Sequence, residues 1–418
     1  PAVSPSRTPA PRRSPVGARP THAVHVLGGA DGPDGGECPS AGATAYARSL
    51  AQGLTARGAR ITVCARHDPA LRHAFTGTGA DVRVLRGRTE AETAVSLRAA
   101  CQDADLVHAH GPHAGLLAAL ALGPGRQGTP LVVTWHAPPG PGPARPTRAD
   151  AARELVTRLL ARRVARAATV VLGATTALVD AARRSGARDA RLAPAPIPIP
   201  VAGPHAGPPD GSADGSLDGS ADGAETLRHK VRAGLGALDR PLVMAVGRLD
   251  GRRGHETALT ASRAWRRLDP PPLLALAGEG PQRAALQRRI DREALPARLL
   301  GRRDDALRLL AGADVALVPG RCQGRSLVAQ EALRSGVPLV AADGGGVPEL
   351  VSDAAVLVPW GDADSLAAAV LTLLTDHDRR AELSRAGRAR ARTWPNEDDA
   401  AAQVLSLYDE LTRTAAGR

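Results

Sequence analysis

A polar, glycine-containing stretch in the second half of the chain has the composition of a phosphate-binding loop. Gln323, Gly324 and Arg325 follow an apolar run, and a helical pattern opens near Ser326. A loop that leads into a helix N-terminus offers free backbone N–H groups and the positive end of the helix dipole, which favour phosphate. Glu331, on the same helix, has the chemistry to accept hydrogen bonds from a ribose diol; on its own it would read as a solvated helix residue.

Two arginines follow another apolar run, 242–246. Gly247 and Arg248 come directly after it, and Arg253 and Gly254 follow within the same short loop. Guanidinium groups bind phosphate oxygens bidentately, so this loop is a second candidate contact to a phosphorylated ligand. The alternative is two more surface arginines in an arginine-rich chain, which the flanking glycines disfavour.

Histidines form a third group. His108 and His110 are two residues apart on an expected strand and therefore share a face, and we expect His113 and His136 to come near them. Such a set could bind a metal ion. Because no carboxylate or cysteine accompanies them, the interpretation we favour is histidines packed and hydrogen-bonded at strand ends.

The elements that position these residues alternate short apolar runs with longer amphipathic stretches. Apolar runs of this kind, separated by helices, are typical of parallel sheets covered on both sides. The expected strands are 22–27, 60–64, 82–85, 106–108, 131–135, 169–172 and 190–193, then 242–246, 273–277, 297–300, 315–318, 338–341 and 355–358. The prediction is an α/β protein of two Rossmann-like domains that face a cleft, with ligands at the carboxyl ends of the strands.

Low-complexity segments set the domain boundaries. The expected order is a disordered basic tail (1–20), a first domain (21–201), an Asp-Gly-Ser-rich linker (202–223), a second domain (224–395) and a C-terminal helix (396–418) that could cross back to the first domain.

The motifs resemble those of retaining glycosyltransferase family 4, which has the GT-B fold. Residues 323–338 are similar to the family pattern Glu-Gly-x-Gly-Leu-x-x-x-Glu-Ala-x-x-x-Gly-x-Pro-Val, with Gln323 and Ser326 replacing the first Glu and the second Gly. Residues 345–349 match Gly-Gly-x-Pro-Glu, and 247–254 match Gly-Arg-Leu-x-x-x-Lys-Gly with Arg253 in place of Lys. In the first half, 105–110 and 134–136 match Asp-x-x-His-x-His and Thr-x-His.

The resemblance implies transfer of a sugar from a nucleotide-diphosphate sugar to an unknown acceptor, with retention and without a metal or a further cofactor. It implies catalytic roles for Arg248, Arg253, His136 and Gln323. It also implies that the residues binding the donor are Gly42, Gly247, Gly324, Arg325, Ser326, Leu327, Glu331, Gly345 and Gly346. The departures at Gln323 and at the domain junction keep a non-catalytic relative open as an alternative, and a sugar-nucleotide epimerase is a further one.

Composition limits the other classes. The net charge of +12 comes from an arginine bias expected of a GC-rich genome, and the 2% aromatic content leaves no stacking platform for nucleic acid. No apolar run is long enough to span a membrane, and the four cysteines show no disulfide or zinc spacing. We therefore expect a cytoplasmic protein. The basic helix 152–167 is interpreted as packed on the sheet with a solvated basic face; a peripheral contact with an anionic membrane is the alternative.

Overall fold

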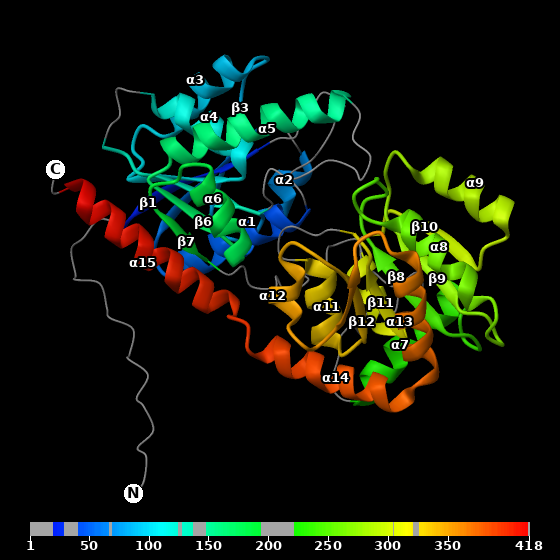
Figure 1. Ribbon diagram of the computed structural model, residues 1–418. Helices are drawn as coiled ribbons and strands as arrows, with labels where there is room; N and C mark the ends of the chain where they lie inside the picture. Colours follow the sequence, from blue (N-terminus) through cyan, green and yellow to red (C-terminus); the bar gives the residue numbers. More distant parts are fainter. Residues whose placement is uncertain are drawn as a thin grey trace, which may run out of the picture.

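The computed structural model describes residues 20–28, 41–66, 69–123, 128–136, 148–193, 221–303, 305–320 and 326–416. These residues form two α/β domains, each built on one parallel sheet (Figure 1). The expected basic tail and the Asp-Gly-Ser linker lie almost wholly outside the described residues.

The N-terminal domain has a seven-stranded sheet in the order β3-β2-β1-β4-β5-β6-β7. Its strands are β1 (His22–Leu27), β2 (Arg60–Arg66), β3 (Asp81–Leu85), β4 (Leu106–His110), β5 (Leu131–Trp135), β6 (Val170–Gly173) and β7 (Ala190–Leu192). Its helices are α1 (Ala41–Ala56), α2 (Pro69–Ala74), α3 (Glu90–Ala100), α4 (Pro112–Leu122), α5 (Arg148–Ala167) and α6 (Thr176–Arg184).

The C-terminal domain has a six-stranded sheet in the order β10-β9-β8-β11-β12-β13. Its strands are β8 (Leu242–Val246), β9 (Leu273–Ala277), β10 (Ala297–Gly301), β11 (Val315–Val318), β12 (Leu339–Asp343) and β13 (Val356–Pro359). Its helices are α7 (Ala221–Leu235), α8 (His255–Trp265), α9 (Arg283–Glu293), α10 (Ala306–Leu309), η1 (a 3₁₀ turn, Leu310–Gly312), α11 (Leu327–Ser335), α12 (Val347–Val351), α13 (Ala363–Thr375) and α14 (His377–Arg392).

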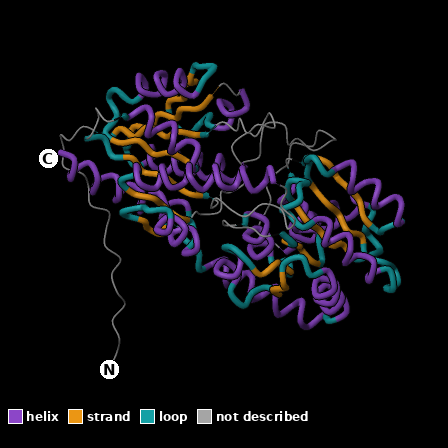
Figure 2. The backbone as a smooth tube through the Cα atoms, turned by 45° about the horizontal axis from the view of Figure 1, so that its top comes forward, coloured by secondary structure: helices purple, strands orange, loops and turns teal. Residues whose placement is uncertain are grey.

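Each expected strand is present, which confirms the two Rossmann-like domains. The inner strands of each sheet are buried on both faces because helices cover both, as Figure 2 shows, whereas the outer strands β3, β7, β10 and β13 are partly exposed. In β1, Val24 and Val26 point to the side of α3, α4, α5 and α6, whereas Ala23 and Leu27 point to the side of α1. Small and branched side chains fill both layers, which suits a chain with few aromatics.

The last helix, α15 (Glu397–Ala416), leaves the C-terminal domain after α14 and packs against α1 of the N-terminal domain (Figure 1). Ala401, Val404 and Tyr408 belong to the N-terminal core on this side of the sheet. The end of the chain therefore links the two domains. Among the described residues, no helix has both the length and the apolar composition needed to cross a bilayer.

Candidate active site

The candidate donor loops follow the two strands at which the order of the C-terminal sheet reverses. The chain moves outward from β8 to β9 and β10, then returns to place β11 on the other side of β8. Such a reversal opens a crevice at the carboxyl ends of the two strands, where ligands of doubly wound sheets bind. Gly247, Arg248 and Arg253 follow β8, and Ser326 follows β11, so the sheet brings both sequence motifs to this point.

Glycines let these loops pack backbone against backbone. Gly278, after β9, has φ +153°, and a Cβ placed there would lie 1.9 Å from the carbonyl oxygen of Gly247. Gly254 caps α8 in the left-handed region (φ +72°), and a Cβ on it would lie 2.3 Å from the carbonyl oxygen of Pro319. Larger residues would push the loops after β8, β9 and β11 apart. The loops therefore form one rigid backbone surface.

Arg248 and Arg253 both follow Gly247 in the loop after β8, and both are exposed. The side-chain carbons of Arg253 come within 4.0 Å of the position a Cβ on Gly247 would take, and Arg248 lies 3.8 Å from the Asp250 carboxylate. Two exposed guanidinium groups beside a glycine backbone are suited to bind a diphosphate.

His255, which the sequence analysis did not single out, supports this loop from below. It is buried at the start of α8, and its Nε2 lies 3.1 Å from the carbonyl oxygen of Arg248. Burial lowers the pKa of His255, so the neutral ring donates its Nε2 proton to that carbonyl. His255 is thus a positioning residue for Arg248. Its place directly after the Arg253-Gly254 pair was the only signal in the sequence.

The helix after β11 begins as expected. The Ser326 hydroxyl accepts a hydrogen bond from the backbone N–H of Ala329, 3.2 Å away, and so caps α11, while Leu327 is half-buried at its first turn. Glu331 is buried, and its carboxylate accepts hydrogen bonds from the Arg334 guanidinium (2.6 and 3.0 Å) and from the Ser335 hydroxyl (3.0 Å). A carboxylate has about four acceptor positions, so room remains for a ribose hydroxyl.

The remaining predicted donor residues are placed unevenly. Gly345 (φ +66°) and Gly346 lie at the start of α12, after β12, which neighbours β11 in the sheet. Gly42 lies in the first turn of α1 in the other domain. Gln323, Gly324 and Arg325 lie outside the described residues.

In the N-terminal domain the order reverses between β1 and β4, and a network of histidines lies there. His25 on β1 is paired in register with His108 on β4, and His110 follows two residues later on the same face. The Tyr408 hydroxyl, from α15, lies 2.6 Å from His108 Nδ1 and 3.0 Å from His25 Nε2. With one proton, that hydroxyl donates to one ring and accepts from the other.

The network continues toward His136. His25 Nδ1 lies 3.3 Å from His110 Nε2, and the His110 ring stacks on the His136 ring with 5.7 Å between centroids. Tyr46 of α1 meets His136 edge-on at 5.2 Å. His136 Nε2 is buried and has no hydrogen-bond partner among the described residues. His136 is therefore held by rings on two sides, with one nitrogen available to a ligand.

Burial keeps these rings neutral. It lowers the pKa of His25 to about 3 and of His136 to about 4, and it lowers the pKa of both His108 and His110 well below the usual value. The cause is the cost of placing a charge in a low-dielectric core. At neutral pH, His136 therefore acts as a hydrogen-bonding group rather than as a cation.

The placement expected for His113 is wrong, whereas the favoured interpretation of packed and hydrogen-bonded histidines fits the structure better than the metal site weighed against it. His113 does not join the group; it lies 3.5 Å from the Glu90 carboxylate at the surface, and His25 takes its place. The three candidate metal ligands, His25, His108 and His110, have ring nitrogens within 4.8 Å of one another, whereas a tetrahedral zinc needs roughly 3.3 Å between them. Most of these nitrogens already have hydrogen-bond partners, so the residues fit a hydrogen-bonded network better than a metal centre.

One contact joins the domains near the candidate site. The Glu349 carboxylate, at the end of the Gly-Gly-x-Pro-Glu match, accepts hydrogen bonds from the backbone N–H (2.9 Å) and hydroxyl (2.6 Å) of Thr176. Thr176 is the first residue of α6, so the carboxylate also faces the positive end of that helix.

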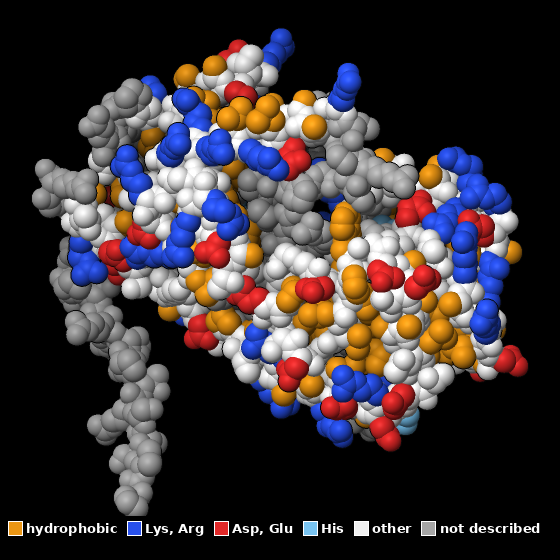
Figure 3. All heavy atoms as spheres, viewed as in Figure 1, with side chains coloured by type: hydrophobic (Ala, Val, Ile, Leu, Met, Phe, Trp, Pro, Cys, Tyr) orange, Lys and Arg blue, Asp and Glu red, His pale blue; other side chains and the backbone are white. Residues whose placement is uncertain are grey.

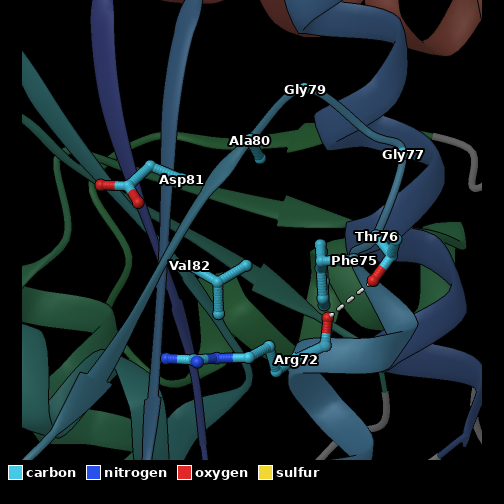
Figure 4. A pocket seen from close by; sticks show the side chains of 8 residues that line it. All are labelled: Arg72, Phe75, Thr76, Gly77, Gly79, Ala80, Asp81 and Val82. Carbon is cyan, nitrogen blue, oxygen red and sulfur yellow. Dashed lines mark hydrogen bonds between the residues drawn. The ribbon is translucent and has the colours of Figure 1, made fainter.

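A shallow hollow of about 700 Å³ lies elsewhere, between α2 and the edge strand β3 (Figure 4). Arg72, Phe75, Thr76 and Asp81 contribute to its lining, and the Thr76 hydroxyl donates to the Arg72 carbonyl oxygen across it. It lies at the β3 edge of the sheet, two strands away from β1, and none of the predicted site residues lines it.

Comparison with protein families agrees with this geometry. Residues 41–198 match the glycosyl transferase 4-like domain, and residues 228–390 match the glycosyl transferases group 1 model. This chain belongs to the family 4-like GT-B glycosyltransferases. Each family model covers most of one domain of the structure, and the model for the C-terminal domain spans both donor motifs.

Curated relatives match part of this chain, and a solved structure shares its fold. The chain is 34% identical over 169 residues to a GDP-mannose-dependent monoacylated phosphatidylinositol monomannoside mannosyltransferase of Corynebacterium glutamicum (38% of this chain, 44% of the relative). It is 36% identical over 171 residues to glycogen synthase of Mycobacterium tuberculosis (39% and 41%). Each match spans less than half of the relative's length. The structure of Anabaena HepE in complex with UDP-glucose shares the fold, with a TM-score of 0.71, 21% identity and coverage of 92% and 99%.

Proposed function

We propose that this glycosyltransferase moves a sugar from a nucleotide-diphosphate sugar to a glycan, lipid or small-molecule acceptor, with retention at the anomeric carbon and without a metal. The observation that carries the proposal is the rigid surface of three loops at the β8/β11 reversal, which presents Arg248 and Arg253 beside the capped N-terminus of α11.

Each residue has a role that its surroundings support. Arg248 and Arg253 stabilise the charge that grows on the departing diphosphate, which is catalysis by preorganised electrostatics. Glu331 accepts hydrogen bonds from the ribose, and the backbone near Ser326, Gly345 and Gly346 donates to phosphate and sugar. Across the domain boundary, neutral His136 contacts the transferred sugar, near the first turn of α1 that carries Gly42.

The nucleobase and the sugar remain open within this proposal. The HepE structure is a complex with UDP-glucose, whereas the corynebacterial relative is a GDP-mannose-dependent enzyme. A thermal-shift screen against UDP-, GDP- and ADP-sugars identifies the donor, because a ligand that binds only the folded state raises the melting temperature.

The proposal is tested with Arg248→Ala and Arg253→Ala. Each removes a charge-assisted contact of about 1.5–3 kcal/mol, so donor affinity measured by calorimetry should fall roughly 10- to 100-fold and turnover should fall with it. Arg252→Ala is the matched control, because Arg252 is an exposed arginine of the same loop. Unchanged affinity and rate in both test variants, or an equal loss in the control, would refute the assignment of this loop.

A non-catalytic relative is the second candidate, because Gln323 replaces the family's Glu. An amide still positions a sugar but supplies no charge to a cationic transition state. Gln323→Glu should then raise turnover on at least one donor at nearly unchanged nucleotide affinity. If neither form turns over any donor that it binds, the non-catalytic function replaces the transferase.

We place the reaction in the cytoplasm, with peripheral membrane contact. Two described cysteines, Cys64 and Cys101, are buried in the N-terminal core and are not joined in a disulfide, which supports a reducing compartment.

A further inference from the structure

Among the residues of α5 whose burial the structure describes, those buried in the N-terminal core all lie in the second half of the helix. Ala161, Val164 and Ala165 are fully buried in the core, where the helix packs against α4 and α6. Residues 155–159, by contrast, are all exposed. The expectation that this helix packs on the sheet with only a basic face in solvent is therefore wrong for its first half, which runs along the outer surface of the domain (Figure 1).

Large apolar side chains gather on that exposed half. Leu155, Val156 and Leu159 are 58%, 57% and 53% exposed. The described residues include seven exposed large hydrophobics, and these three fall within five consecutive positions. Scattered apolar residues on a surface need no explanation, but a cluster on one helical turn marks an interaction site.

Arginines continue the same face toward the end of the helix. Relative to Leu155, the residues Leu159, Arg162, Arg163 and Arg166 follow at offsets of 4, 7, 8 and 11, which places them on one side of an α-helix. This side is opposite the buried residues named above. Figure 3 shows the result over α5, a group of hydrophobic side chains with Lys and Arg side chains beside it. We call Leu155, Val156, Leu159, Arg162, Arg163 and Arg166 the α5 face.

The composition of the α5 face indicates which kind of partner binds it. A second copy of this chain, docked symmetrically on the apolar cluster, would offer the arginines few opposite charges, because α5 itself carries only two carboxylates. An anionic bilayer meets both halves at once, since its acyl boundary takes up the leucines and valine while its phosphates attract the guanidinium groups. Six arginines against two carboxylates along α5 strengthen that attraction.

We propose that the α5 face docks on the surface of an anionic lipid bilayer, with Leu155, Val156 and Leu159 inserted at the level of the headgroups. The N-terminal domain then carries the contact, and the donor loops of the C-terminal domain stay in water. This inference goes beyond sugar transfer and does not depend on it, because membrane binding is measured without a donor.

Sedimentation with lipid vesicles tests the proposal. The full chain should bind vesicles of phosphatidylcholine with 30% phosphatidylglycerol at least tenfold more strongly than pure phosphatidylcholine vesicles. Leu155→Ser/Leu159→Ser should lower the partition coefficient at least tenfold at any salt concentration. Arg162→Gln/Arg163→Gln should lower it at low salt and leave little further loss at high salt, because screening already removes the charge contribution.

Matched controls come from exposed residues elsewhere. Val95→Ser/Leu238→Ser removes two apolar side chains that are 68% and 46% exposed, and Arg288→Gln/Arg292→Gln removes two arginines from one face of α9. Neither should change vesicle binding, and all four variants should melt like the parent. The proposal is overturned if the α5 variants bind vesicles as the parent does or if the controls lose as much. It is also overturned if sedimentation velocity shows a dimer that only the α5 variants abolish.

Discussion

At the scale of single residues, the carboxylate of Glu331 shows how the chain prepares a ligand contact. It is buried at the base of the donor loops, where it pairs with the Arg334 guanidinium and accepts a hydrogen bond from the Ser335 hydroxyl of its own helix. Those contacts hold it in one orientation, so a ribose hydroxyl meets an acceptor that does not reorganise.

We expect Glu331→Gln to weaken UDP or GDP binding by about 10- to 100-fold, the cost of about 1.5–3 kcal/mol for a hydrogen bond to a charged acceptor. Binding of inorganic diphosphate, which has no ribose, should stay the same. Calorimetry with both ligands measures the difference. An equal loss for diphosphate would mean that Glu331 holds the phosphate loop instead of the ribose.

The neutral histidines make the stability of the N-terminal domain depend on pH. The pKa values of His25 and His136 lie near 3 and 4 in the folded chain, below the unfolded value of about 6.5. At a pH between the folded and the unfolded pKa values, the unfolded chain therefore binds more protons than the folded chain does. The stability is fully present above pH 6.5 and is lost as the pH falls.

The free energy of unfolding should fall by about 1.4 kcal/mol per pH unit for each such histidine between pH 6.5 and 5. Urea titrations at pH 7, 6 and 5 measure it. Carboxylates with lowered pKa values, such as Asp305, release their contribution only below their own normal range near pH 4, so they do not blur this window. A flat profile from pH 7 to 5 would show that water reaches the rings.

At the scale of elements, α15 completes the histidine network of the N-terminal domain, although it follows directly after the C-terminal domain in the chain. Its Tyr408 hydroxyl bridges His25 and His108, and both rings are fully buried. Tyr408→Phe keeps the ring packing but leaves two buried nitrogens without a partner. We expect the N-terminal domain to lose about 1–3 kcal/mol of stability.

Thermal unfolding compares this variant with Thr412→Val, whose hydroxyl donates to the carbonyl oxygens of Tyr408 and Asp409 within α15 itself. Tyr408→Phe should lower the melting temperature by several degrees and the control by much less. Equal melting temperatures for the parent and Tyr408→Phe would mean that the hydroxyl contributes nothing to the network.

The strands could be predicted because each is an apolar run with turn residues at its ends, and their ends differ from the expected ones by only one or two residues. The donor loops could be predicted because their glycines and arginines are adjacent in sequence. Tyr408 could not, since it lies 300 residues from His108 and nothing local links them. The exposure of Leu155 and Leu159 could not be predicted either. Helical periodicity identifies an apolar face but does not say whether a neighbouring element covers it.

At the scale of the whole molecule, the two domains are joined by α15 and by the contact between Glu349 and Thr176. The chain itself passes from α14, which packs on α11 of the C-terminal domain, to α15, which packs on α1 of the N-terminal domain. This link is covalent and therefore permanent. The Glu349 contact is exposed and rests on two hydrogen bonds, so it can open and close at little cost. It is therefore suited to bias the domains toward the arrangement seen here.

We expect Thr176→Val to shift the molecule toward more open arrangements, because it removes one of the two hydrogen bonds and leaves the start of α6 intact. The radius of gyration in solution scattering should increase. Donor affinity should stay the same, since the candidate diphosphate and ribose contacts all belong to the C-terminal domain. The rate of transfer to the acceptor should fall severalfold, because His136 and the first turn of α1 approach the sugar only from the N-terminal domain. Thr375→Val is the control, because the Thr375 hydroxyl donates to a carbonyl oxygen within α13.

Two outcomes would contradict this prediction. If Thr176→Val slows transfer without any change in scattering, or if it lowers donor affinity in parallel, Thr176 acts at the site itself and not through the angle between the domains.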